Sequence, residues 1–141
     1  MNAVGIDVSI VTAADSHEVA ALYKDAGWWR DDYDEDFIPA MIAGSFRFAA
    51  AYDGGRLIGM GRAISDGVSD AYIQDVVVLG EYRGRGIGAR LVRLLTDSLH
   101  AAGIDWIGLI GEPGTGDFYR RLGFENMPGY LPMRMEGGGH V

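Results

Sequence analysis

The chain has 141 residues, of which 48% are hydrophobic and 23% are charged. This length and composition predict one globular domain with a sizeable core. The formal net charge of −8 at neutral pH argues against a general binder of nucleic acid or of anionic membranes, because both need a basic protein surface. The chain has no cysteine, which excludes disulfides, thiolate metal sites and a cysteine nucleophile.

The sequence also gives no sign of a metal site or a membrane segment. The three histidines, His17, His100 and His140, lie far apart and lack metal-ligand spacing, so no metal is expected. No apolar segment with a basic flank begins the chain, and no apolar run approaches the roughly 20 residues that cross a bilayer. We therefore expect a cytoplasmic protein without a membrane partner.

The first third of the chain predicts one strand and two helices. Alternation over residues 7–12 is typical of a short strand, and Asp15 is a suitable N-cap for a helix that runs to about Ala26 and ends at Gly27. An acidic cluster then precedes a second short helix, whose N-terminus favours negative charge. The cluster is Asp31, Asp32, Asp34, Glu35 and Asp36, and the helix carries Phe37, Ile38, Met41 and Ile42.

The middle of the chain predicts three antiparallel strands. Residues 46–52 and 56–65 form an expected hairpin joined by Asp53-Gly54-Gly55, because Asp-Gly is a preferred two-residue turn that accepts positive φ. Residues 69–79 are the next expected strand, which a second Asp-Gly pair precedes.

The longest predicted helix covers residues 86–102 and ends at Gly103. Its apolar face comprises Ile87, Leu91, Leu94, Leu95 and Leu99. A second, short helix is expected to start from an Asp117 cap and to run to Leu122.

The remaining strands complete the expected fold. A buried strand is predicted over residues 106–110, and closing strands are predicted over 124–127 and 131–135. The resulting order, β-α-α-β-β-β-α-β-α-β-β, predicts an α+β fold with one curved, mixed sheet flanked by helices. We expect a single domain over residues 1–136 and a flexible glycine-rich tail over 137–141.

The most informative stretch is residues 76–89, V-V-V-L-G-E-Y-R-G-R-G-I-G-A, where a β-branched run enters a glycine-spaced loop and then the long helix. Gly84, Gly86 and Gly88 carry no side chains that would keep an anion away from the backbone N–H groups at the positive end of that helix. The neighbouring arginines add positive charge. The stretch therefore predicts a phosphate site.

Three phosphate-binding motifs compete for this stretch. Gly84-x-Gly86-x-x-Ala89 matches the dinucleotide fingerprint, and Asp105 lies about 20 residues further on, as that motif requires. However, residues 80–83 separate the glycines from the strand, and Asp105 precedes the next strand instead of ending it. A nucleotide P-loop is excluded because no Gly-Lys-Ser/Thr follows.

The third motif is Arg83-x-x-Gly86-x-Gly88, directly after the valines at 76–78. With it the chain resembles the GNAT superfamily of acetyl-CoA-dependent N-acetyltransferases, in which an Arg/Gln-x-x-Gly-x-Gly/Ala loop after the fourth strand holds the CoA pyrophosphate. Residues 118–124, F-Y-R-R-L-G-F, resemble the F-Y-x-x-x-G-F segment of the same family. One helix and one strand separate the two motifs, as the family requires, and the resemblance covers nearly the whole chain.

The resemblance implies acetyl-CoA as the co-substrate. The backbone of Val76, Val77 and Val78 would pair with the pantetheine arm as an added strand does. The loop that would take the pyrophosphate, mainly through backbone N–H groups, comprises Arg83, Gly84, Arg85, Gly86, Ile87 and Gly88. The family often has proline where this chain has Gly80, which leaves the rigidity of the loop open.

Tyr119, in the second motif, is the catalytic residue that the resemblance implies. When an amine attacks a thioester, a thiolate leaves, and a thiol has a pKa of about 8.5 against about 10 for a phenol. A phenol therefore donates a hydrogen bond or a proton to the departing sulfur. The alternative is a tyrosine whose ring simply packs in the core.

The base that takes the proton of the amine is less well defined. Asp75 directly precedes the pantetheine strand and is the candidate, while Asp66 and Asp70 lie on the approach and would act through water. A route through ordered water alone, or a purely structural Asp75, stays open. The chain lacks a cysteine nucleophile and a Gly-x-Ser-x-Gly motif, so we expect direct transfer in a ternary complex.

The acceptor pocket is expected at the front end of the chain, from Trp28, Trp29, Phe37 and Tyr72, with Tyr23 beside them. Aromatic ring faces beside negative charge attract an amine, although a core tryptophan and a solvated acidic helix start would give the same pattern. We expect a primary amine of a small molecule as the acceptor. Transfer to protein lysines or N-termini, and an acyl-CoA-binding sensor without turnover, stay open.

The resemblance also bears on assembly, because domains of this family often pair. Residues 131–135 are the candidate interface strand of a homodimer. No nucleic-acid partner is expected.

Overall fold

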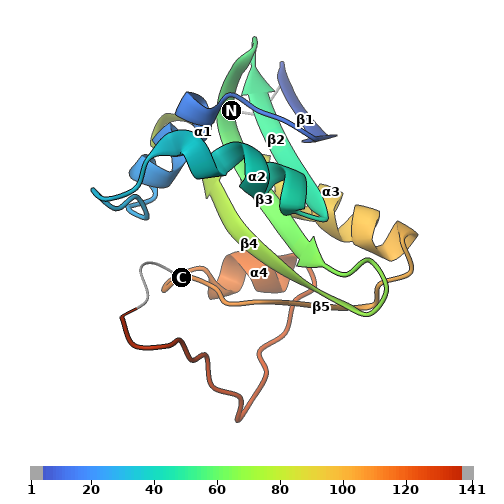
Figure 1. The fold of residues 1–141 in the computed structure, drawn as a ribbon. Helices are drawn as coiled ribbons and strands as arrows, with labels where there is room; N and C mark the ends of the chain where they lie inside the picture. The colour runs from blue at the N-terminus through green and yellow to red at the C-terminus, as the bar shows by residue number, and fades with distance from the viewer. Residues whose placement is uncertain (1–4, 138–141) are drawn as a thin grey trace.

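A computed structural model describes residues 5–137, and its centre is a five-stranded sheet in the order β1-β2-β3-β4-β5 (Figure 1). The strands are β1 (Ile6–Val11), β2 (Arg47–Asp53), β3 (Arg56–Ser65), β4 (Asp70–Val78) and β5 (Trp106–Leu109). Strands β1 to β4 pair antiparallel, and β4 pairs with β5 in parallel. The predicted mixed sheet is confirmed, because a long crossover joins the two parallel strands.

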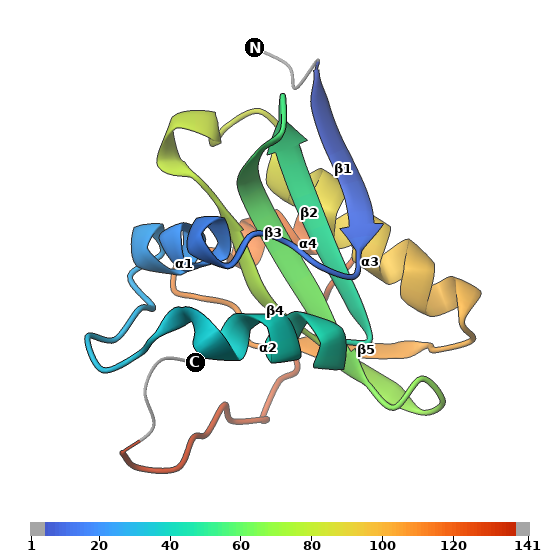
Figure 2. The ribbon, with the colours of Figure 1, turned by 45° about the horizontal axis from the view of Figure 1, so that its top comes forward.

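Helices cover both faces of this sheet (Figure 2). The helices α1 (Ser16–Asp25) and α2 (Ile38–Gly44) lie on one face, and α3 (Ile87–Ala101) lies on the other, where α4 (Gly116–Arg121) also packs. Two 3-10 turns, η1 (Glu35–Phe37) and η2 (Gly80–Tyr82), precede α2 and α3. The predicted cap is confirmed, since the Asp15 side chain accepts a hydrogen bond from the Glu18 N–H at 3.0 Å.

The residues of β2 alternate between two hydrophobic cores. Ala49 and Ala51 face the core on the α3 side, whereas Phe48 and Ala50 face the core on the α1 and α2 side. All four are essentially inaccessible to solvent. A strand that is covered on both faces has no polar side, which explains the continuous apolar run in β2.

Strand β4 contains a bulge in the part that precedes the glycine loop. Met60 of β3 pairs with Val77, but Arg62 pairs with Gln74, so β4 contains one residue more than β3 here. Asp75 in this bulge has φ 59, the one positive φ of a non-glycine residue in the described chain. Gly61 lies opposite, and a Cβ there would be 3.2 Å from both Leu95 and Val76. The glycine therefore makes room for the bulge.

The hairpin turn lies one residue later than predicted. Asp53 still pairs with Arg56, so the two turn residues are Gly54 and Gly55, with φ of 56 and 94. Both positions need positive φ, which glycine adopts at a lower free energy than aspartate does.

Two predictions about the segment after α3 are wrong in detail. The N-cap residue of α4 is Thr115, and Asp117 lies inside the first helical turn, where its charge suits the positive helix end. Strand β5 is not buried: Trp106 is 42% exposed and only Gly108 is fully covered. This strand lies at the edge of the sheet within residues 5–137, so its outer face meets solvent.

The closing strands predicted over 124–127 and 131–135 do not form. The described residues after Arg121 contain no helix or strand, and Leu131, Met133 and Met135 are 77–86% exposed. Alternating apolar residues fit a half-buried strand only where a neighbouring edge pairs with them. Pro132 removes one backbone donor in the middle of the second segment.

The predicted flexible tail, apart from Gly137, lies outside the described residues. Among residues 5–137, no helix is both long and apolar enough to cross a membrane.

Candidate active site

The end of β4 has a backbone edge with no neighbouring strand. Strand β5 pairs with β4 only from Asp70 to Ile73, whereas β3 pairs with β4 as far as Val78. In the described part of the chain, residues 76–78 therefore have a strand neighbour on one side only. Val77 and Val78 are buried in the two hydrophobic cores, so their side chains serve packing. An amide-rich ligand satisfies such an edge by pairing with it.

The glycine loop lies at the N-terminus of α3. Gly84 and Gly86 have φ of 77 and 79, and a Cβ at either position would meet nothing within 4 Å. Gly86 is the N-cap residue and supplies no side-chain cap, so the first N–H groups of α3, from Ile87 on, keep their hydrogen-bonding capacity for a ligand. Open space above uncapped N–H groups suits a phosphate.

The two arginines of the loop have different surroundings. Arg83 donates from Nε to the Val78 carbonyl at 3.0 Å and from Nη2 to Asp25 at 3.1 Å, so it ties the loop to β4 and α1. Arg85 donates to the Glu81 carbonyl at 3.2 Å and lies over the Tyr82 ring, 5.2 Å from its centroid. Arg85 has no carboxylate partner among the described residues, and its charge is the better placed for an anion.

The two sequence motifs meet at Gly88. A Cβ on this residue would be 3.3 Å from the Phe118 ring and 3.9 Å from Val78. The first turn of α3, the end of β4 and the neighbour of Tyr119 in α4 are therefore in contact. A side chain at position 88 would push these three elements apart.

Tyr119 lies half-buried in a groove of about 1230 Å³ that also contains Glu112 and Thr115. Its ring packs edge-on against Phe118 and Phe124, at centroid distances of 4.9 and 5.8 Å. Burial raises the pKa of the Tyr119 phenol, and the negative charge of Glu112 raises it further. The hydroxyl therefore stays protonated at neutral pH.

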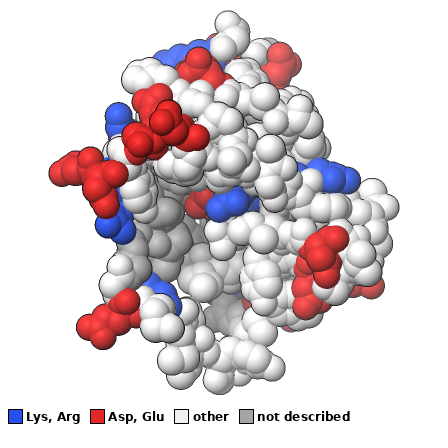
Figure 3. All heavy atoms as spheres, viewed as in Figure 1, with Lys and Arg blue, Asp and Glu red and all other residues white. Residues whose placement is uncertain are grey.

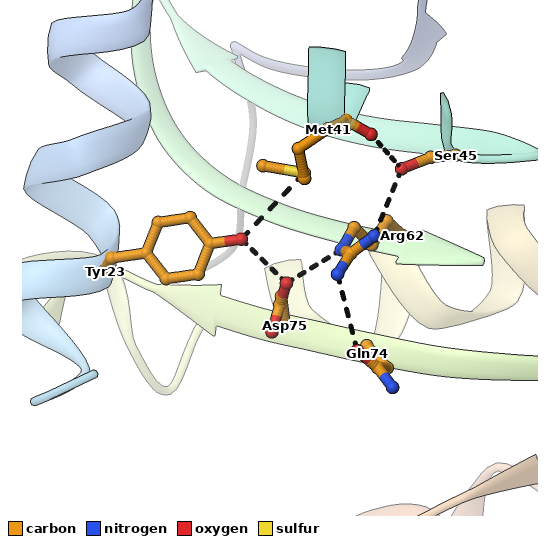
Figure 4. Close-up of polar contacts among 6 residues, drawn as sticks. All are labelled: Tyr23, Met41, Ser45, Arg62, Gln74 and Asp75. Atoms are coloured by element: carbon orange, nitrogen blue, oxygen red, sulfur yellow. Dashed lines mark hydrogen bonds and ion pairs between the residues drawn. The ribbon is translucent and has the colours of Figure 1, made fainter. Parts of the chain in front are cut away.

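Asp75 belongs to a buried polar network (Figure 4). Its Oδ2 atom accepts hydrogen bonds from the Tyr23 hydroxyl at 2.7 Å and from Arg62 Nε at 2.8 Å, and its side chain is only 5% exposed. Burial raises the pKa of Tyr23, and the Asp75 charge and hydrogen bond raise it further. Tyr23 is thus a neutral donor to a carboxylate that Arg62 neutralises.

This network forms the floor of a cavity of about 500 Å³ between α1, η1, α2 and the bulge of β4. Its lining residues are Tyr23, Tyr33, Phe37, Met41, Arg62, Gln74 and Asp75. Figure 4 shows that the Tyr23 and Met41 side chains approach Asp75 and Arg62 from the helical side. The cavity is in the size range of small-molecule sites, about 300–1,000 Å³.

The predicted acceptor residues separate into three places. Phe37 lines the cavity, and Trp29 stacks on it with a centroid distance of 5.9 Å. Trp28 donates from Nε1 to Glu112 at 2.9 Å, which links the segment after α1 to the loop after β5. Tyr72 packs on Trp106 and faces the larger groove with Tyr119, not the cavity.

The sequence interpretation missed Arg62, Tyr33 and Glu112. Arg62 carried a signal, because it is the one charged residue within the apolar run of residues 57–64. A charge buried in a strand needs a partner, which pointed to a carboxylate nearby. Nothing in the sequence singled out Tyr33 or Glu112, because their roles depend on contacts between distant segments.

Comparison with known proteins places this site in a family. The model of the Acetyltransferase (GNAT) family matches residues 10–124. The histone acetyltransferase TAP1 of Glycine max is 33% identical over 125 residues, which is 81% of this chain and 53% of that protein. The chloroplastic GCN5-related N-acetyltransferase 2 of Arabidopsis thaliana is 45% identical over 73 residues, which is 52% of this chain and 28% of that protein.

A solved structure shows the same fold. A probable acetyltransferase from meticillin-resistant Staphylococcus aureus superposes with a TM-score of 0.80 at 23% identity and covers 93% of this chain and 98% of its own. The chain spans about half or less of the length of the two curated relatives above. Because the family model matches most of the residues that build the sheet, the glycine loop and Tyr119, this chain belongs to the GNAT acetyltransferase family.

Proposed function

We propose that this protein transfers the acetyl group of acetyl-CoA to a primary amine of a small molecule, by direct attack of the amine in a ternary complex. The observation that carries the proposal is the contact at Gly88, where the end of β4, the uncapped start of α3 and the segment of Tyr119 meet. A backbone edge, an anion site and the helix that carries Tyr119 are thereby close together.

Two independent features of the chain suit the binding of CoA. The edge of residues 76–78, which lacks a second strand neighbour in the described chain, suits the amides of the pantetheine arm. The open space over Gly84 and Gly86, with Arg85 beside it, suits the pyrophosphate. When bound, acetyl-CoA supplies an activated acetyl group as a thioester.

Residues of the chain then accept and donate the protons of the reaction. The acceptor ammonium loses a proton to Asp75, directly or through water, and the amine nitrogen forms a bond to the acetyl carbonyl carbon as the carbon–sulfur bond breaks. Tyr119 donates a proton to the leaving sulfur and recovers one that the nitrogen loses. The products are an amide and a free thiol, with one proton released to solvent.

Two other functions compete with this proposal. Transfer to protein lysines draws support from the soybean relative, whose printed name is histone acetyltransferase and which aligns with 81% of this chain. A sensor that binds acyl-CoA without turnover would have no use for Tyr119. A cytoplasmic location and a homodimer through residues 131–135 remain predictions, the second testable by sedimentation of the full chain.

Calorimetric titration with acetyl-CoA, CoA and NADH is the experiment that tests the proposal. We expect both CoA compounds to bind and NADH to give no signal. Release of free thiol is then measured with an amine panel and with a lysine peptide. Binding of NADH alone would overturn the proposal, and turnover of the peptide alone would replace the small-molecule acceptor.

A further inference from the structure

The cavity above Asp75 is lined by segments that lie far apart in the chain. Tyr33 and Phe37 come from the segment before α2, Arg62 from β3, and Gln74 and Asp75 from the bulge of β4. The volume of about 500 Å³ is sufficient for a small amine that carries an aromatic ring.

One wall of the cavity is a preassembled group of aromatic rings. Phe37 stacks on Trp29 with centroids 5.9 Å apart at 24°, and Tyr33 meets Phe37 edge-on at 5.8 Å and 70°. Trp29 and Tyr33 are 5.4 Å apart at 89°. Phe37 nevertheless remains 40% exposed, so its ring is held in place by neighbours while part of it faces open space. A rigid, partly exposed ring is suited to stack on another ring.

The described lining of the cavity offers no more than one carboxylate to an ammonium group. Asp75 is the one carboxylate of the described lining, and Arg62 already pairs with it. A second ammonium, as in a polyamine, would find no further carboxylate inside.

The segment that carries Tyr33 and Phe37 is acidic. The exposed carboxylates of Asp31, Asp32, Asp34 and Asp36 precede the second helix. Figure 3 shows acidic side chains gathered at one edge of this face, on the side where the segment between α1 and α2 projects in Figure 1. This charge attracts cations and repels a ligand that carries a carboxylate.

We propose that the acceptor is a small arylalkylamine with one positive charge, whose ring lies against Phe37 and Tyr33 and whose amine lies at the Asp75 end of the cavity. This inference rests on the proposed acetyl transfer and names its substrate class. The reaction is the one written above, in which the amine nitrogen becomes an amide and the thiol is released.

Four acceptors test this class by their kcat/KM, with phenethylamine as the reference. Phenethylamine has the ring and one charge, hexylamine lacks the ring, phenylalanine adds a carboxylate, and spermidine adds ammonium groups. We expect phenethylamine to be the preferred acceptor. Hexylamine should be roughly three- to tenfold poorer, and phenylalanine at least about tenfold poorer.

The variant Phe37→Leu assigns the ring preference to this cavity. Leucine keeps apolar bulk but cannot stack, so the advantage of phenethylamine over hexylamine should fall to about one. Phe46→Leu is the matched control, because Phe46 packs beside Gly67 and is not among the lining residues of the cavity. Acetyl-CoA affinity, measured by calorimetry, should be unchanged in Phe37→Leu, which reports that the variant is folded.

The outcomes separate this inference from the proposed function. Preference for spermidine, phenylalanine or hexylamine, or an unchanged ratio in Phe37→Leu, would overturn the arylalkylamine class and leave acetyl transfer in place. Binding of acetyl-CoA without acetylation of phenethylamine would do the same. Failure of the wild-type chain to bind acetyl-CoA would overturn both.

Discussion

The two halves of the candidate site are built in different ways. The half for acetyl-CoA is backbone from one contiguous stretch, residues 76–88, where the edge of β4 continues into the glycine loop. The half for the acceptor is side chains from α1, η1, α2, β3 and β4. A backbone site tolerates change except where φ or space demands glycine, whereas a side-chain site depends on each residue. Variants in the two halves should therefore fail in different ways.

Tyr119→Phe should give the largest effect, because it removes the proton donor while the backbone site stays intact. We expect kcat to fall by about 10²-fold or more with the acetyl-CoA affinity unchanged. The measurements are thiol release at saturating amine and calorimetric titration with acetyl-CoA. An unchanged kcat would remove Tyr119 from the reaction.

Asp75→Asn should damage the acceptor half by leaving Arg62 without its ion-pair partner. Breaking a largely buried pair from one side destabilises the fold by about 2–3 kcal/mol once the partial exposure of Arg62 is allowed for. The double variant Arg62→Gln/Asp75→Asn should recover part of this loss in urea denaturation. If the single and double variants were equally unstable, the ion pair would not be the source of the loss.

Gly86→Ala should weaken acetyl-CoA binding by about tenfold in Kd, because a residue with a Cβ is strained by roughly 1–2 kcal/mol at φ of 79 and relieves the strain by moving the N–H groups that would hold the pyrophosphate. Gly54→Ala is the matched control, since Gly54 also has positive φ, 56, but lies in the hairpin turn. Both variants should lose similar stability on thermal unfolding, and only Gly86→Ala should lose affinity. Equal affinities in the two variants would contradict the placement of the pyrophosphate.

The pH dependence of stability should report the tyrosine in the acceptor half. The pKa of Tyr23 is raised in the folded state, so above about pH 10 the unfolded chain loses this proton first and stability falls with rising pH. We expect the contribution of Tyr23 to the free energy of unfolding to be constant below this range and to decline above it. Tyr23→Phe should decline less over the same range, and an equal decline would assign the effect to other groups.

Local sequence patterns predict much of the fold, and the strand predictions that were wrong have a common cause. The Asp15 cap, the long helix that Gly103 ends, and the parallel pair around it were all predictable, because caps, turns and periodicity act over a few residues. The closing strands over 124–127 and 131–135 were predicted and do not form. A strand exists only where another strand pairs with it, and no local pattern reveals that partner.

The candidate site likewise has one part that local sequence patterns predict and another that depends on tertiary contacts. The sequence by itself determined the glycine loop, the valines before it and the motif around Tyr119. The backbone conformation at the start of a helix depends on residues that are adjacent in the sequence, so a local pattern reveals it. Only the tertiary structure decided that Asp75 is paired with Arg62 and Tyr23, that Tyr72 faces the larger groove, and that Tyr33 joins Phe37 in one wall. Ion pairs and aromatic contacts act through space over a few ångströms, so they depend on which distant segments the fold brings together.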